Sequence, residues 1–182
     1  VAVGPISDLV FGDWDLNAVR PLQAEVGLGE VAKKKKDIDE DLVKELADLK
    51  SDPIKLVRGL DRGLFVVDHH HGARAWIEAN RPTGICQLVN HPFSTTAPAF
   101  WTELKDRGWV RLADKSGNPI TAEALPKTLK ALPDDPYRTL AWMVRKADGY
   151  CRALMTPSPP PFAEFRWADW LRKRSDLPLA NV

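Results

Sequence analysis

A short apolar run leads directly into a polar stretch of unusual composition near the middle of the chain. Residues 64–67 are apolar or β-branched, which predicts a buried strand, and residues 68–72 have the sequence Asp-His-His-His-Gly. A helix is expected to follow at once, because Ala73, Trp76 and Ile77 recur at helical spacing. The first N–H groups of a helix have no partner within it, so a junction of this kind is suited to an anion. Any fold for this chain must therefore contain a strand that runs straight into a helix.

Apolar spacing and turn residues predict the other elements. Further strands are expected at residues 5–11, 54–57 and 85–89. Further helices are expected at residues 39–50, 97–107, 137–147 and 162–174. This mixture predicts an α+β domain with a small mixed sheet and packed helices over residues 1–95. Residues 96–182 are expected to form a mostly helical extension that packs on this core as part of a single structural unit.

The charge balance argues against broad electrostatic capture of nucleic acid. The chain has 182 residues, with 26 Lys and Arg against 25 Asp and Glu, and a formal net charge of +1. Sequence-specific DNA binding is therefore not expected, and any recognition of phosphate must be local. No apolar run approaches the roughly 20 residues that cross a bilayer, so no membrane span is expected.

The cysteines and the first residues favour a cytoplasmic protein. Cys86 and Cys151 make a disulfide framework improbable and have no metal-binding spacing. Residues 1–10 lack the basic start and the long apolar stretch of a secretory signal. We therefore expect a reduced compartment and a cytoplasmic location.

Residues 68–74 are the strongest candidates for a functional site. Asp68, His69 and His70 are the candidate catalytic residues, since a carboxylate can act as a base and a histidine titrates near neutral pH. The candidate phosphate-binding residues follow at the start of the helix: His71, Gly72 and Arg74. An arginine one turn into the helix can bind phosphate oxygens with its guanidinium fork. A structural alternative stays open, in which Asp68 only caps the helix and one histidine is buried in the core.

A divalent metal ion is a further expectation at this junction. Carboxylate and phosphate oxygens suit Mg²⁺ or another divalent cation, which Asp68 and His70 would hold. Three consecutive histidines cannot all bind one ion, because neighbours are about 100° apart on a helix and alternate in a strand. A zinc site would therefore combine Asp68 with two of the three histidines.

Several blocks of the chain also resemble a known family. Residues 64–75 resemble the signature of the ParB and sulfiredoxin superfamily, in which a strand leads into a helix that holds nucleotide phosphates. More closely, the chain resembles the ParB-like nuclease branch in five blocks that follow one another along most of its length: Arg20-Pro21-Leu22-Gln23 with Val26-Gly27, Val67-Asp68-His69-His70-His71, Phe100-Trp101 with Gly108-Trp109-Val110, Asp135-Pro136-Tyr137-Arg138, and Phe162-Ala163-Glu164-Phe165-Arg166-Trp167-Ala168-Asp169. The resemblance implies a ParB/sulfiredoxin-like fold for the core.

The departures from the superfamily pattern narrow the expected function. Where sulfiredoxins have a catalytic cysteine this chain has His70, so repair of sulfinic acids is not expected. Where partition proteins have consecutive arginines it has His71 and Gly72, and it keeps only Arg74. We therefore expect a nuclease-type protein that binds a phosphate, nucleotide or phosphodiester at residues 68–74, with metal-assisted phosphoryl chemistry. The alternative is a non-catalytic regulatory module that binds a nucleotide or another anion.

Polar residues in the other blocks form a second group of candidates. Arg20 and Gln23 lie in the first block and are expected to add contacts to phosphate. Glu164, Arg166 and Arg138 would form a second wall of the site if the C-terminal helix folds back across the first half of the chain.

Overall fold

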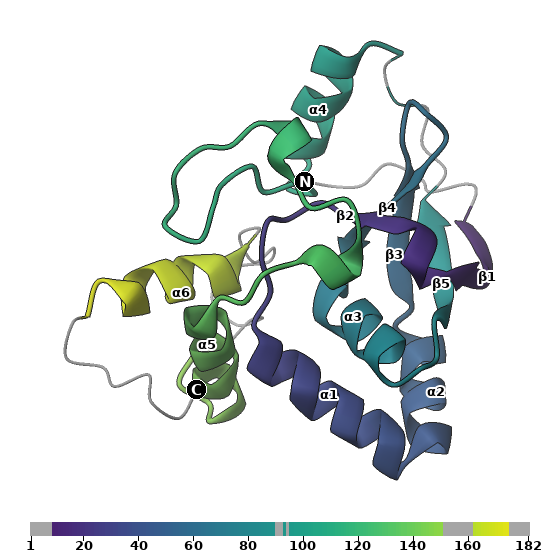
Figure 1. Cartoon of the computed structure of the whole chain (residues 1–182), viewed down its shortest axis with the longest axis vertical. Helices are drawn as coiled ribbons and strands as arrows, with labels where there is room; N and C mark the ends of the chain where they lie inside the picture. Colours follow the sequence, from purple (N-terminus) through teal and green to yellow (C-terminus); the bar gives the residue numbers. More distant parts are fainter. Residues whose placement is uncertain (1–8, 90–92, 94, 151–161, 175–182) are drawn as a thin grey trace.

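One mixed five-stranded sheet organises the molecule, a computed structural model in which residues 9–89, 93, 95–150 and 162–174 are described (Figure 1). Its strands lie in the order β1-β5-β3-β4-β2. The bounds are Leu9–Asp15 for β1, Val19–Pro21 for β2, Ile54–Arg58 for β3, Leu64–Asp68 for β4 and Thr83–Val89 for β5. The pairs β1–β5 and β3–β4 are antiparallel, whereas β3–β5 and β2–β4 are parallel. The expected α+β fold with a small mixed sheet is confirmed.

Both edges of the sheet differ from the sequence prediction. The strand expected at residues 5–11 instead continues to Asp15, because Asp13 and Asp15 pair with β5 on an edge strand; residues 5–8 lie outside the described part. The short strand β2 was not expected. Its last residue, Pro21, is tolerated because proline is accepted on edge strands, where no ladder hydrogen bond is lost.

The prediction of one helix at residues 39–50 has the wrong bounds. Two helices occupy this region, α1 at Leu28–Glu40 and α2 at Leu42–Ser51. The lysine run therefore lies inside α1, where each lysine pairs with an acidic residue four positions away, as in Lys34 with Glu30 and Lys36 with Glu40. Asp41 separates the helices and accepts a hydrogen bond from the Lys44 N–H at 3.0 Å, which caps α2.

The remaining helices follow the prediction closely. They are α3 at His70–Glu78, α4 at Ala97–Asp106, α5 at Pro136–Lys146 and α6 at Ala163–Arg172, with short 3₁₀ turns at Leu16–Ala18, Ala122–Ala124 and Leu129–Ala131. In Figure 1, α5 and α6 lie side by side, and α5 also contacts α1. Among the described residues, no helix is both long and apolar enough to span a membrane.

Side chains cover both faces of the sheet. Leu56 and Val57 are adjacent in β3, point to opposite faces and are fully buried. The core beside α1 and α3 includes Leu56, Val66, Ala73, Trp76 and Leu129, and the core beside α4 includes Leu22, Val57, Phe65, Phe100 and Leu104. Residues beyond position 95 contribute to both cores, and the boundary at that position stays a prediction.

Candidate functional site

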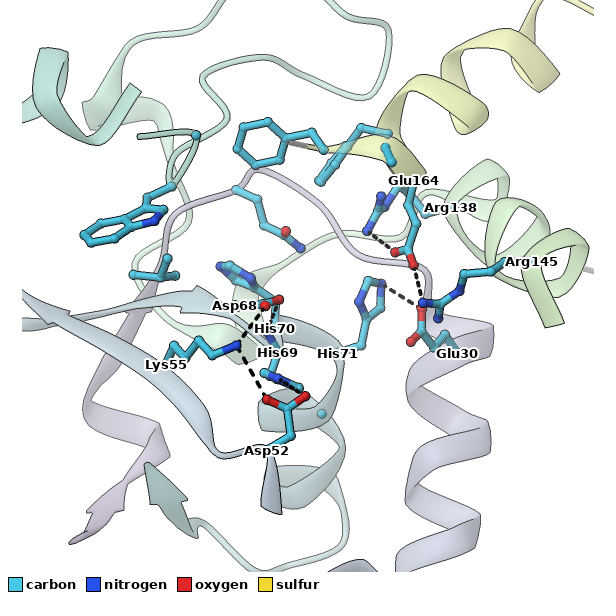
Figure 2. Close-up of a pocket in the computed structure, with 18 of the residues that line it drawn as sticks. Glu30, Asp52, Lys55, Asp68, His69, His70, His71, Arg138, Arg145 and Glu164 are labelled. Carbon is cyan, nitrogen blue, oxygen red and sulfur yellow. Dashed lines mark hydrogen bonds and ion pairs between the residues drawn. The ribbon is translucent and has the colours of Figure 1, made fainter. Parts of the chain in front are cut away.

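A cavity of about 600 Å³ lies where the end of β4 and the start of α3 meet α1, α5 and α6 (Figure 2). Eight of the predicted site residues line it: Gln23, Asp68, His69, His70, His71, Gly72, Arg138 and Glu164. The lining also includes charged or aromatic residues that the sequence analysis did not name as site residues, among them Glu30, Lys34, Asp52, Lys55, Trp109 and Arg145.

The strand–helix junction has an unusual backbone. β4 ends at Asp68, and His69 then adopts a left-handed conformation with φ of 70° before α3 begins at His70. Such a conformation is uncommon outside glycine, asparagine and aspartate. The Asp68 carboxylate accepts a hydrogen bond from the His69 N–H at 2.8 Å, and the side chain of the N-cap residue, His69, makes no cap hydrogen bond. The alternative in which Asp68 serves only as the helix cap is therefore not what the structure shows.

His70 and His71 are buried and hold backbone in place. The Nε2 atom of His70 accepts a hydrogen bond from the Leu22 N–H at 3.2 Å, and that of His71 accepts one from the Gly27 N–H at 3.1 Å. Burial lowers the pKa of His70 to about 3 and that of His71 well below 6.5. Both rings are therefore neutral, with the Nε2 lone pair in use.

These contacts correct three predicted roles. His70 cannot shuttle protons or bind a metal through a lone pair that the Leu22 N–H already occupies, and a neutral His71 has no charge to offer phosphate. In the described part of the chain, no group of three or more His, Cys, Asp and Glu side chains is arranged to hold a metal ion. The residues present therefore do not fit the expected Mg²⁺ or Zn²⁺ site.

One end of the cavity carries charged groups that solvent can reach. Lys55 Nζ lies 3.6 Å from an Asp68 oxygen and 3.5 Å from an Asp52 oxygen, and His69 Nε2 lies 3.2 Å from the other Asp52 oxygen. Burial raises the pKa of Asp68, but His69, its N–H group and Lys55 outweigh burial, so the pKa lies below the usual 3.8. Asp68 is therefore an ionised carboxylate at the same end of the cavity as the His69 imidazole.

The other end of the cavity is built from buried charges. Arg138 Nη2 lies 3.5 Å from one Glu164 oxygen, and Arg145 Nη1 lies 3.0 Å from the other. The guanidinium carbon of Arg138 lies 3.6 Å from the centre of the Phe165 ring. Among the described residues, Nε and Nη1 of Arg138 have no hydrogen-bond partner. Buried N–H groups nearly always have an acceptor, and the described residues supply none for these two.

Glu30 is the buried carboxyl of this end and was missed by the sequence analysis. One of its oxygens lies 3.6 Å from His71 Nε2 and has no hydrogen-bond partner in the described structure, and the other lies 3.7 Å from Lys34 Nζ. Burial, followed by the nearby Glu164, raises the pKa of Glu30 above 4.5. Glu30 lies in no recognisable motif. It could have been found only if the charged segment around it had been predicted to form a helix.

Close packing of α1 against α5 brings Glu30 and Arg138 to the same cavity. A Cβ atom on Gly27 would lie 2.6 Å from the backbone N of Thr139 and 3.0 Å from the backbone carbonyl carbon of Arg138, so only glycine permits this approach. The Gly29 N–H also donates to the Thr139 hydroxyl at 3.1 Å. The chain segments before α1 and around Arg138 are thus fixed together.

Three predicted residues lie away from the cavity. Arg74 is turned along α3, where it pairs with Glu78 and donates to the Leu129 carbonyl at 2.7 Å. Arg20 forms an ion pair with Asp61 at 2.7 Å, and Arg166 is exposed to solvent. The predictions that Arg20 and Arg74 bind the same ligand as Asp68, and that Arg166 forms a wall of its site, are therefore not supported by their positions.

This fold, with a β4–α3 junction facing a charged cavity, is that of an α+β protein of the ParB-like class. The family described as "Putative ParB-like nuclease" matches residues 13–173, and the chain belongs to this family. It is also similar to the crystal structure of protein Atu1540 from Agrobacterium tumefaciens, with 28% sequence identity and a TM-score of 0.78, over 93% of this chain and 82% of that one. No curated protein matches the chain.

Proposed function

We propose that this protein binds a nucleotide or a phosphodiester strand in the cavity, with a phosphate group on Arg138, and hydrolyses it. The observation that carries the proposal is the pair of buried Arg138 N–H groups without a described acceptor. The two groups lie on different edges of the guanidinium, so each offers a donor to a separate phosphate oxygen. Membership of the ParB-like nuclease family supports a phosphodiester as the ligand.

Asp68 and His69 are the groups proposed to act on the ligand. Asp68 accepts a proton from a water molecule, and the water oxygen forms a bond to the phosphorus of a further phosphate of the ligand, at the end of the cavity opposite Arg138. The bond from phosphorus to the leaving oxygen breaks, and His69 protonates that oxygen. Asp52, 3.2 Å from His69 Nε2, orients the imidazole. The non-catalytic alternative rests on His70 and His71, because two of the three histidines at the junction have structural contacts.

Arg138→Lys is expected to weaken binding of deoxyadenosine monophosphate by about 10- to 100-fold, since lysine keeps the charge but loses the separate, rigidly placed Nε and Nη1 donors. Isothermal titration calorimetry measures the affinity. The matched control is Arg111→Lys, because Arg111 is partly buried and lies over the same Phe165 ring at 4.3 Å but does not line the cavity.

The control variant should bind within about threefold of the wild type. Circular dichroism and thermal melting establish that both variants are folded at the temperature of the titration. A folded Arg138→Lys protein that binds as tightly as the wild type would remove the basis of the proposal.

A further inference from the structure

The cavity is open at one end and closed at the other. At the open end, the side chains of Asp52 and Asp68 are 62% and 49% exposed. At the closed end, those of Glu30 and Arg138 are 6% and 4% exposed. Figure 2 shows the two groups on opposite sides of His71.

We propose that the closed end receives a terminal phosphate monoester, so that a nucleotide or a strand enters the cavity end first. This inference rests on the proposed function and names its substrate class. α1, α3, α5 and α6 all contribute walls to the closed end, through Glu30, His71, Arg138 and Glu164. An internal phosphodiester on Arg138 would need room for the strand on both sides of the phosphate, whereas a terminal phosphate needs room on one side only.

The contact between Glu30 and His71 favours the protonated form of the Glu30 carboxyl group. The His71 Nε2 lone pair already points at the Gly27 N–H, so this nitrogen carries no proton. One Glu30 oxygen lies 3.6 Å from this nitrogen. If Glu30 were ionised, a lone pair of this oxygen would face the nitrogen lone pair with no hydrogen between them. A protonated Glu30 removes this repulsion and supplies an O–H group that can donate to a phosphate oxygen.

The charge at the closed end then matches a terminal phosphate. The charged groups around Glu30 are Lys34 on its own helix, Arg138 and Arg145 on α5, and Glu164 on α6, while His71 on α3 is neutral. Three cations and one carboxylate leave a charge of +2 when Glu30 is protonated. A phosphate monoester carries about −1.5 to −2 near pH 7, whereas an internal phosphodiester carries only one negative charge.

The test uses one short oligodeoxynucleotide with an internal fluorophore in three forms: 5′-phosphorylated, 3′-phosphorylated and unphosphorylated. Fluorescence anisotropy measures binding, and gel electrophoresis of the same samples establishes that the strand is intact. At least one phosphorylated form is expected to bind about tenfold or more tightly than the unphosphorylated form, and Arg138→Lys should remove this preference. Equal binding of all three forms by the wild type would overturn the inference but leave the proposed function standing; no binding of any form would overturn both.

Glu30→Gln tests the proton separately. Because the phosphate binds beside the protonated acid, wild-type affinity should fall as the pH rises and Glu30 loses its proton, which happens above its usual pKa of 4.5. The second ionisation of the phosphate itself near 6 acts on the wild type and the variant alike. A glutamine at this position is an uncharged donor at every pH, so the substitution Glu30→Gln should flatten this profile. The control is Glu40→Gln, which changes an exposed carboxylate of the same helix. A Glu30→Gln profile as steep as that of the wild type would overturn the role of Glu30.

Discussion

Asp68→Asn is expected to lower turnover of an end-labelled oligodeoxynucleotide by about 10²- to 10⁴-fold, the contribution typical of a positioned acid–base group. Asparagine has the same shape, and its amide oxygen can still accept the hydrogen bond from the His69 N–H that Asp68 accepts at 2.8 Å. It cannot take a proton from water. Affinity should stay within about threefold, because the phosphate contacts at Arg138 lie at the other end of the cavity. Product formation is measured with and without Mg²⁺, Mn²⁺ and Zn²⁺.

The matched control for this experiment is Asp48→Asn. Asp48 is an exposed carboxylate on α2 that pairs with Lys44, and it does not line the cavity. Its substitution should leave turnover unchanged. Full turnover by Asp68→Asn would show that Asp68 is not the base. A wild-type protein that binds the strand through Arg138 but never cleaves it would favour the non-catalytic binding module.

Lowering the pH below 6.5 is expected to destabilise the fold through His70 and His71. Their pKa values are depressed in the folded state, so between pH 6.5 and about 3 the unfolded chain binds more protons. For His70 the difference corresponds to a loss on the order of 5 kcal/mol once the pH reaches 3. Glu25 acts in the opposite sense: burial raises its pKa to about 7, so its contribution declines as the pH rises from 4.5 to 7.

Urea unfolding of variants at several pH values measures the contribution of His70 to the pH dependence of stability. His70→Gln keeps an acceptor for the Leu22 N–H but cannot titrate, so its stability should depend less on pH between 6.5 and 3 than that of the wild type. His69→Gln is the control, since His69 lies at the open end of the cavity. Identical pH dependence of the His70→Gln and wild-type proteins would show that His70 is not held neutral.

Elements with a local apolar pattern could be predicted from the sequence. Strand β4 and helix α3 are an example, because the branched side chains of one and the spacing of Ala73, Trp76 and Ile77 in the other need no knowledge of distant contacts. Helix α1 could not be predicted in the same way. Its surface is stabilised by charge pairs four residues apart, and only Glu30, Val31 and Ile38 are buried in it.

Only the open end of the candidate site could be predicted from the sequence. Asp68 and His69 follow directly from the strand–helix junction. The closed end depends on the approach of Gly27 to Thr139, two residues more than 100 positions apart, and no local pattern encodes such a contact. Arg74 was misplaced for a related reason: the Leu129 carbonyl, which accepts its hydrogen bond, comes from a distant part of the chain.

The buried N–H groups of Arg138 that have no acceptor among the described residues bear on how this position has evolved. Each buried donor without an acceptor costs about 1–3 kcal/mol, so the closed end of the cavity is a weak point of the fold. Selection for stability alone would favour an apolar replacement of similar volume at this position. If Arg138 binds phosphate as proposed, the arginine marks a compromise in which conformational stability is given up for ligand binding.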